Sequence, residues 1–176
     1  SSLPAAGALR AGLSRRGLRQ ERATAARHRA PRRIVKAPRW VSILLAPVLV
    51  LTGVTGSVLL TATAANGNLT DSGTVAVSGT AAFTTSADDA DITLNELAVT
   101  GDVSITTNGS SGNVTLVNAT GIEFGASTVD GNLTATATTG NLTDEETVTV
   151  SGTASFMTSA DDADITLNEL AVTGDV

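Results

Sequence analysis

The sequence predicts an all-β protein, a parallel β-solenoid built from short coils of ~22 residues. Two observations predict this fold. First, the stretch Gly67–Val103 recurs almost unchanged as Gly140–Val176, 73 residues later, with five differences in 37 aligned positions. Second, short runs in both copies alternate apolar and polar residues and end at Gly, Asn or Asp, as strands and turns do. Near-identical units of this kind bury their apolar faces by stacking on one another.

Charge divides the chain into parts that need separate interpretation. All eleven Lys and Arg lie between Arg10 and Arg39, whereas sixteen of the seventeen acidic residues lie from Asp71 onward. The chain has no Cys, which excludes a disulfide framework and a thiolate metal site. Aromatic residues are few, and the abundance of Thr, Val, Gly, Asp and Asn favours strands and turns over helices.

Residues 1–40 are predicted to be a disordered basic head, because they are rich in Arg, contain one acid and show no apolar face. Such a head could contact nucleic-acid phosphates, or it could be an organelle transit peptide. Its position directly before an apolar stretch favours a third interpretation, the extended positive flank of an export signal. No nucleic-acid partner is therefore expected.

Residues 41–65 are predicted to be the apolar part of a signal peptide with its cleavage site, or a signal anchor. Val41–Leu60 carries no charge, and Ala62-Thr-Ala64 suits signal peptidase, with cleavage after Ala64 or Ala65. The same apolar stretch is long enough to span a bilayer as one helix. A buried core helix is the remaining alternative. The first two interpretations predict a secreted or cell-surface protein that meets the membrane through residues 41–60, during export or as an anchor.

Residues 66–176 are predicted to form the solenoid itself. A motif of Val, a polar residue and Gly recurs with Gly spacings of 22, 30, 21 and 22, so each 73-residue repeat is predicted to hold three coils. The longer step is predicted to carry an outward loop, Thr120–Ala126. The motif glycines are Gly79, Gly101, Gly131, Gly152 and Gly174. A β-sandwich of repeated hairpins is the alternative fold, and the near-identity of the repeats favours the solenoid.

Stacked coils predict ladders of inward side chains, because equivalent strands pair in parallel about 4.8 Å apart. The first predicted ladder contains Val77, Val99, Val129, Val150 and Val172. The second contains Phe83, Ile105, Ala135 and Phe156. The third contains Ile92, Leu94, Val114, Leu116, Ile165 and Leu167.

The repeat motifs resemble those of a known group of surface proteins. The Val75–Phe83 and Val148–Phe156 units, the recurring Gly-Asn-Leu-Thr units and the Asp-Ile-Thr-Leu segment are similar to bacterial filamentous-haemagglutinin-type proteins. They are still more similar to the giant repeat-rich, adhesin-like proteins of planctomycete-type bacteria. The resemblance covers residues 66–176 and implies a right-handed parallel β-helix, export and a role on the cell surface. It also implies that the chain is a fragment of a longer protein.

The densest carboxylates form one candidate site, which occurs in both copies. These residues are Asp88, Asp89, Asp91, Asp161, Asp162 and Asp164. Clustered carboxylates can bind Ca²⁺, but the spacing matches neither an EF-hand loop nor a glycine-rich nonapeptide repeat. A solvated acidic turn explains them as well, so no metal and no other cofactor is predicted.

Catalysis is not predicted. From Asn66 onward the chain has no Lys, Arg or His to serve as a base or phosphate ligand, and no Trp or Tyr to stack on sugars. The leading functional hypothesis is an exported cell-surface protein of adhesin type. Its stiff acidic β-helix would make many weak contacts with polysaccharide, matrix or other cells. The alternatives are a β-helical polysaccharide-active enzyme, which would need two converging carboxylates, and a Ca²⁺-stabilised surface-layer component.

Overall fold

The structure, a computed structural model, describes residues 40–44 and 49–176. The chain divides into two units, Ser1–Lys36 and Ala37–Val176, and all the described residues belong to the second unit. The predictions for the basic head therefore lie outside the described residues. Within the described residues the regular elements are all strands. They include no helix that could cross a membrane.

The strands form one sheet in which every pairing among the described residues is parallel. The strands are β1 (Trp40–Leu44), β2 (Leu49–Leu51), β3 (Ser57–Ala64), β4 (Leu69–Asp71), β5 (Val75–Asp88), β6 (Ile92–Val99), β7 (Val103–Asn108), β8 (Val114–Asn118), β9 (Ile122–Phe124), β10 (Ser127–Val129), β11 (Leu133–Ala137), β12 (Leu142–Asp144), β13 (Val148–Val150), β14 (Ala154–Thr158), β15 (Ile165–Thr166) and β16 (Leu170–Val172).

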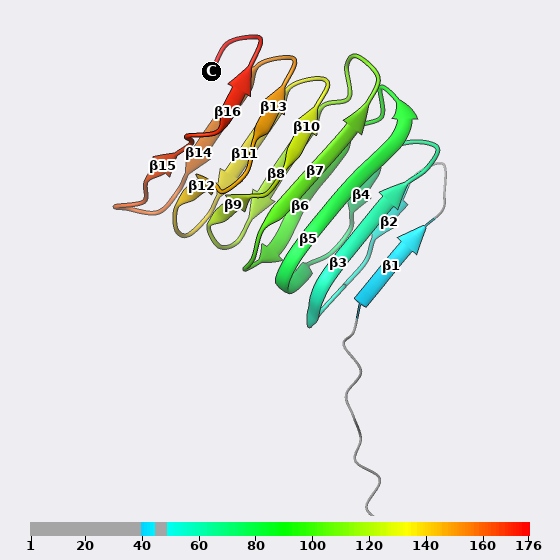
Figure 1. The fold of residues 1–176 in the computed structure, drawn as a ribbon. Coiled ribbons are helices and arrows are strands. Elements are labelled where there is room, and N and C mark those ends of the chain that lie inside the picture. Colours follow the sequence, from blue (N-terminus) through cyan, green and yellow to red (C-terminus); the bar gives the residue numbers. More distant parts are fainter. Residues whose placement is uncertain (1–39, 45–48) are drawn as a thin grey trace, which may run out of the picture. The chain divides into compact units, whose positions relative to one another are not determined.

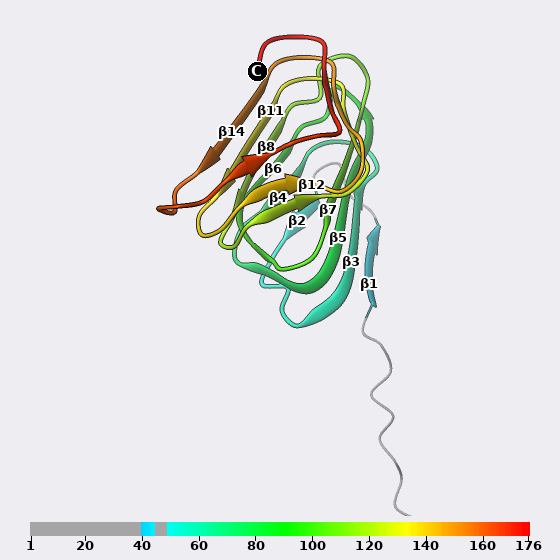
Figure 2. The same cartoon turned by 60° about the vertical axis from the view of Figure 1, so that its left-hand side comes forward.

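The strands build two stacks, between which the chain passes back and forth (Figures 1 and 2). The first stack has the order β2, β4, β6, β8, β11, β14. The second stack begins with β1, β3, β5 and β7 and continues with the strand pairs β9 and β10, β12 and β13, and β15 and β16. The result is a parallel β-solenoid of about six coils. The predicted solenoid is confirmed, and the β-sandwich alternative, which needs antiparallel strands, is wrong.

The core lies between the two stacks, because alternate residues of each strand point inward. In β7, for example, Val103 and Ile105 are buried whereas Thr106 is exposed. Phe124 is fully buried, and its ring meets that of Phe156 edge-on, with centroids 6.2 Å apart and an interplanar angle of 75°. Burial of these aliphatic and aromatic side chains is the main source of stability, at roughly 25 cal/mol per Å² of apolar area.

Asn and Asp side chains bond successive coils at one corner, which explains the recurring Gly-Asn-Leu-Thr units. The N–H of Asp91 donates to Asn68 Oδ1 at 3.0 Å, and the N–H of Asn113 donates to Asp91 Oδ1 at 2.8 Å. The same relation continues from Asn113 to Asn132, at 3.0 Å. Each side chain thus satisfies a backbone donor of the next coil where the chain leaves the strand ladder.

Two kinds of half-coil alternate along the chain. A two-segment half-coil has two short inward-facing segments with a break between them, as in β6, where Asn95 and Glu96 are both exposed. A one-segment half-coil is a single strand, as in β7. The two-segment kind lies in the first stack at β4 (with Val75–Val77) and at β6, and in the second stack at β9/β10, β12/β13 and β15/β16. In the first copy of the repeat the two-segment half-coils thus lie in the first stack, and in the second copy they lie in the second stack.

The change occurs at β7 and β8, two one-segment half-coils in succession. Between β4 and its repeat counterpart β12, the chain passes through seven half-coils: β4 with the start of β5, the rest of β5, β6, β7, β8, β9 with β10, and β11. One 73-residue repeat thus spans three and a half coils, and its second copy lies on the opposite stacks. The prediction of three coils in each repeat is wrong.

This half-coil offset divides each predicted ladder in two. Val77 pairs with Val99, but Val129 pairs with Val150 in the other stack. Phe83 pairs with Ile105 in the second stack, whereas Ala135 pairs with Phe156 in the first. Ile92 and Leu94 pair with Val114 and Leu116, whereas Ile165 pairs with Leu142. The pairings within the first two ladders, and those of Ile92 and Leu94, were predicted correctly. Leu142, the partner of Ile165, was missing from the third ladder, and the joining of the two halves of each ladder was wrong.

The segment Thr120–Ala126 is not an outward loop. It contains β9, whose Ile122 and Phe124 are 2% and 0% exposed. The 30-residue step between Gly101 and Gly131 therefore contains one and a half coils rather than one coil with an insertion. The added half-coil is what shifts the second copy to the opposite stacks.

Solenoid strands also occur N-terminal to Asn66, in the stretch predicted to be an apolar signal or anchor helix. β1 pairs with β3, and β3 pairs with β5. Leu60, Ala62 and Ala64 are fully buried, because Ser57–Ala64 alternates small or apolar residues with Thr as an inward-facing strand does. In the residues it describes, the structure thus differs from the predicted helix. The part of this stretch at residues 45–48 lies outside the described residues, and the export role remains a prediction.

Candidate functional site

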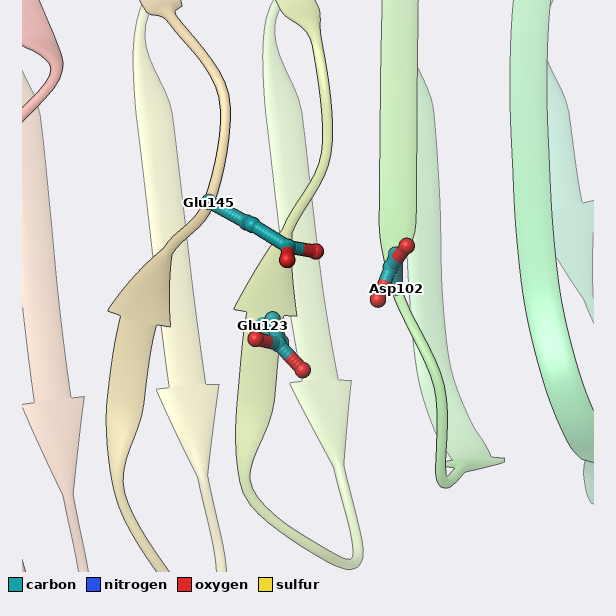
Figure 3. Close-up of side chains that lie close together, drawn as sticks. All are labelled: Asp102, Glu123 and Glu145. Carbon is teal, nitrogen blue, oxygen red and sulfur yellow. The ribbon is translucent and has the colours of Figure 1, made fainter.

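Three carboxylates from three successive coils converge on one side of the solenoid. Asp102 directly precedes β7, Glu123 lies in the middle of β9, and Glu145 directly follows β12. Their carboxylate oxygens lie within 4.8 Å of one another. Figure 3 shows the side chain of Glu145 reaching toward that of Glu123, with Asp102 on the neighbouring coil. We call this group the acidic trio.

Backbone pairing places the acidic trio. Val103 pairs with Phe124, and Phe124 pairs with Asp144. The three acids are the chain neighbours of these paired residues, so they come to the same side of the solenoid. The N–H of Glu145 donates to the carbonyl of Phe124 at 2.9 Å, which fixes Glu145 directly above β9. Phe124 is fully buried and points inward, so its neighbour Glu123 points outward.

The acidic trio has no cation to balance it among the residues described, since the last Arg or Lys of the chain is Arg39 and its single His is His28. Two unit charges at this separation repel by about 1 kcal/mol at the dielectric constant of water, and by less in salt. Glu123 and Glu145 are exposed and Asp102 is half-buried. Carboxylates held this close can share a hard divalent cation, or they can remain a solvated acidic patch.

A shallow pocket of about 440 Å³ lies beside Glu123. Backbone and small side chains of the turns line it, among them Gly101, Gly121 and Gly140, and Thr143 of β12. The pocket has no aromatic wall, so it offers hydroxyl and peptide groups but no stacking surface for a sugar ring.

The predicted Ca²⁺ candidates in the first copy contact the next coil. Asp88 accepts an amide N–H of Asn108 at 2.7 Å, and Asp91 accepts the N–H of Asn113 at 2.8 Å. Asp89 accepts two backbone N–H groups of residues 110–111, at 2.9 and 3.0 Å. These carboxylates therefore bond one coil to another. In the second copy, Asp161 and Asp162 are exposed in the turn between β14 and β15, and the N–H of Asp164 donates to Asn141 Oδ1 at 3.0 Å.

Among the described residues, the carboxyl of Asp89 is the one whose pKa departs clearly from its ordinary value. Hydrogen bonds donated first by the backbone N–H of Ser110, and also by Ser111, hold the pKa of the Asp89 carboxyl below its usual value of 3.8, because they stabilise the anion. Asp89 also adopts φ 58°, and its repeat counterpart Asp162 adopts φ 61°. Asp tolerates this left-handed conformation better than most residues do.

The acidic trio was missed in the sequence. Asp102, Glu123 and Glu145 are separated by 21 and 22 residues, close to one coil each. That spacing is the signal that could have found them. It was hidden because Thr120–Ala126 was assigned to a loop, which removed Glu123 from any stack.

Comparison with known proteins gives one match. A protein-family model described as repeats of unknown function (DUF5649) matches residues 43–106 and 111–175. No match was found among curated proteins or among solved structures. The break between the two matched segments falls at the end of β7, next to the point where the half-coil kinds change stacks. Because the two segments together cover most of the chain, the protein belongs to this family of repeats of unknown function.

Proposed function

We propose that the chain is part of an exported, cell-surface repeat protein of adhesin type, whose solenoid sides make many weak contacts with polysaccharide, matrix or other cells. One observation carries the proposal: each stack presents an outward row of threonines from successive coils. The row of the first stack contains Thr70, Thr93, Thr115 and Thr134. The row of the second stack contains Thr63, Thr84, Thr106, Thr128 and Thr149.

These threonine rows suit repeated, uncharged ligands. Successive hydroxyls recur at the strand spacing of about 4.8 Å, and each can donate and accept a hydrogen bond. Single contacts of this kind are weak, but many of them along one chain gain strength because each bound contact holds the next ligand unit nearby. Because each coil contributes a strand to both stacks, both sides of the solenoid carry such a row, which favours bridging of two surfaces.

A binding experiment tests the threonine rows. The full chain is applied to arrays of purified polysaccharides and to fixed bacterial cells, alongside Thr106→Glu/Thr128→Glu, which places two charges within the row of the second stack. The matched control, Glu146→Gln, changes one charge outside both rows. We expect the row variant to bind severalfold less and the control to bind as the unchanged protein does. Absence of binding to every polysaccharide and cell surface would contradict the proposal.

The export part of the proposal has its own test. Mass spectrometry of the native product from fractionated source cells reads its first residue and its size. A first residue at Ala65 or Asn66 in a surface or secreted fraction supports a cleaved signal. An intact N-terminal segment in the membrane fraction supports an anchor. An uncleaved product in the soluble cytoplasmic fraction would overturn export.

A polysaccharide-active enzyme is the second candidate, and the acidic trio beside the pocket is the observation that favours it. Cleavage of glycosides needs two carboxyl groups, about 5–9 Å apart, on either side of the scissile bond. The carboxylate oxygens of the trio lie within 4.8 Å of one another, just below this range. The test is release of reducing ends from a polysaccharide panel by the full chain and by Glu123→Gln. Activity that is abolished in Glu123→Gln but kept in Glu96→Gln, a change away from the trio, would favour the enzyme over the adhesin.

Thermal melting distinguishes the third candidate, a Ca²⁺-stabilised surface-layer component, from the adhesin and from the enzyme. A ligand that binds the folded state raises the melting temperature in proportion to the logarithm of its concentration. The adhesin proposal expects the same melting temperature in calcium and in chelator at equal ionic strength. A rise in calcium that Glu123→Gln removes would favour the calcium-dependent candidate.

A further inference from the structure

The outward side of the second stack carries two columns of uncharged side chains on five successive coils. Strands β3, β5, β7, β10 and β13 lie side by side there (Figure 1). One column is the threonine row of this stack. A companion column stands two residues earlier in each coil and contains Thr61, Ala82, Ser104, Ala126 and Thr147. We call the two columns together the threonine face.

The threonine face is level, because none of its side chains is longer than threonine. The outward side of the first stack is not level: beside its threonine row stand Val117, Thr136 and the longer Met157, and the carboxylate of Glu96 is exposed there. The acids nearest to the threonine face are those of the acidic trio, which precede the companion column by two or three residues. They mark one margin of the face and leave its interior without charge.

The level surface continues through the one irregular coil. Pairing shifts by one residue between Val103–Phe124 and Thr106–Thr128. The added residue is Gly125, where a Cβ would lie 2.6 Å from Ser104 Oγ, so the irregular coil adds no side chain to the face.

Parallel stacking gives the threonine face two fixed repeats. Successive coils are about 4.8 Å apart, and alternate residues along one strand are roughly 6.6 Å apart. The β-branched threonine side chain has few rotamers, so its hydroxyl and methyl groups are ordered before any ligand arrives. The face is therefore a rigid array that is periodic in two directions.

The hydroxyls of the threonine row are free to bind a ligand. Hydroxyls at the turns bond another part of the chain: Thr120 donates to the carbonyl of Val99 at 2.6 Å, and Thr139 donates to that of Ala119 at 2.7 Å. In the part of the chain that the structure describes, the hydroxyls of the second-stack row, Thr63 to Thr149, have no hydrogen-bond partner. Each can still donate and accept a hydrogen bond.

This chemistry suits an uncharged solid. The threonine face offers no charge to an ion and no aromatic ring to a sugar, and each hydroxyl or methyl makes only a weak contact. Binding therefore needs a ligand that meets many of these groups at once. A polysaccharide chain is periodic in one direction, whereas a crystal surface is periodic in two. The prism surface of hexagonal ice is uncharged, donates and accepts hydrogen bonds, and repeats at two distances similar to those of the face.

We propose that the threonine face binds ice. Water held on the hydroxyls and around the methyls takes up the two repeats of the face, so it joins the crystal lattice with little further ordering. Chains adsorbed in this way make the ice front between them curve, and a curved front grows only at a temperature below the melting point. This activity goes beyond the adhesin proposal and needs no polysaccharide, matrix or cell.

The growth of a single ice crystal in a solution of the full chain tests the proposal. Nanolitre osmometry measures the gap between the melting temperature and the temperature at which the crystal begins to grow. We expect a gap that widens with protein concentration, and faceted crystals within it. Thr106→Tyr/Thr128→Tyr raises two rings above neighbouring positions of the threonine face and is expected to narrow the gap severalfold.

The matched control places the same two rings on the other side of the solenoid. Thr115→Tyr/Thr134→Tyr changes neighbouring positions of the first stack and is expected to keep the gap of the unchanged chain. Tyr is a good strand former, so both double variants are expected to fold, and thermal melting of each verifies it. The single variants Thr106→Tyr and Thr115→Tyr repeat the comparison with half the perturbation.

Two results would overturn the proposal: a gap no wider than that of a non-binding protein at the same molar concentration, or equal narrowing by the two double variants. Polysaccharide arrays separate this outcome from that of the adhesin proposal. A chain that binds polysaccharide but leaves ice growth unchanged contradicts ice binding alone, whereas a chain that arrests ice and binds no polysaccharide or cell contradicts the adhesin alone.

Discussion

Asn118 lies fully buried between two coils, where its side-chain amide accepts the N–H of Val99 and donates to the carbonyl of Val99, both at 2.9 Å. Val99 ends a two-segment half-coil, but the one-segment β8 above it has no second segment to pair with these groups. Ser127 does the same for Ile105, whose N–H it accepts at 3.1 Å. Polar side chains thus replace the missing strand pairing where the half-coil kinds change stacks.

Replacing Asn118 with Ala is expected to lower the free energy of unfolding by about 1–3 kcal/mol, because the N–H of Val99 would stay buried without its partner, whereas the C=O of Val99 keeps the hydroxyl of Thr120 at 2.6 Å. Urea unfolding followed by circular dichroism measures the change. Asn168→Ala is the matched control: residue 168 is exposed and bonds Asp144 through its backbone. The control is expected to stay within about 0.5 kcal/mol of the unchanged protein. Equal losses in both variants would contradict this role of Asn118.

Asp89 is expected to make stability depend on pH. Its pKa is lowered in the folded state, so its contribution is present above the unfolded value of about 3.9 and is lost as pH falls through the lower folded value. Asp89→Asn keeps a residue that tolerates the positive φ but removes the anion. It is expected to be less stable than the unchanged protein near neutral pH, and the difference should shrink below the folded pKa.

Urea unfolding across this pH range measures the effect of Asp89→Asn. Asp162→Asn is its control, because residue 162 has the same sequence context and nearly the same φ, 61°, but lies in the last coil. We expect Asp162→Asn to change the pH dependence little. A pH profile unchanged by Asp89→Asn would rule out this account.

At the scale of elements, stacked glycines set how closely the corners of successive coils approach. The N–H of Gly152 donates to the carbonyl of Gly131 at 3.0 Å, and that of Gly174 donates to Gly152 at the same distance. A Cβ built on Gly152 would lie 2.7 Å from the carbonyl oxygen of Gly131. The recurring Gly of the Val-polar-Gly motif is therefore required by the close approach of two backbones.

Gly152→Ala is expected to destabilise the fold by about 1–3 kcal/mol, as overpacking against a backbone does. Gly73→Ala is the control, since the nearest atom to its new Cβ is 3.6 Å away, an ordinary contact distance. That variant is expected to be neutral or slightly stabilising, because Ala restricts the unfolded chain. Thermal unfolding of both variants decides the matter: similar losses would mean that the corners do not limit coil spacing.

The strands and their facing were predictable from the sequence, because Val103, Ile105 and similar pairs alternate with polar residues. The long-range register was not. The 30-residue step after Gly101 can hold either a loop or an added half-coil, and local patterns do not distinguish them. The pair Ile122 and Phe124 around Glu123 was the available signal of a strand. Because this segment was assigned to a loop and not to a strand, neither the half-coil offset nor the acidic trio could be derived.

At the scale of the whole molecule, the solenoid is a strongly acidic body. The residues from Trp40 to Val176 contain sixteen acids and no Lys, Arg or His. Charges along successive coils repel one another in the folded state more than in an expanded chain. Hydrophobic burial between the stacks must therefore exceed this repulsion for the coils to remain stacked.

Added sodium chloride is expected to raise the melting temperature of the full chain, because the screening length falls from about 30 Å at 0.01 M to about 3 Å at 1 M. Melting followed by circular dichroism over this range is the measurement. A melting temperature that falls with salt would show that attraction between the basic head and the acidic body exceeds repulsion within the body.

The half-coil offset has a genetic consequence. Recombination between the two near-identical copies would delete or add 73 residues, yet the pairing within each copy would be kept, so the product could still fold. Every residue downstream would then move to the opposite stack. Odd and even copy numbers would thus display the same surface on alternate sides, and a lineage could change which surface it exposes without altering a single codon.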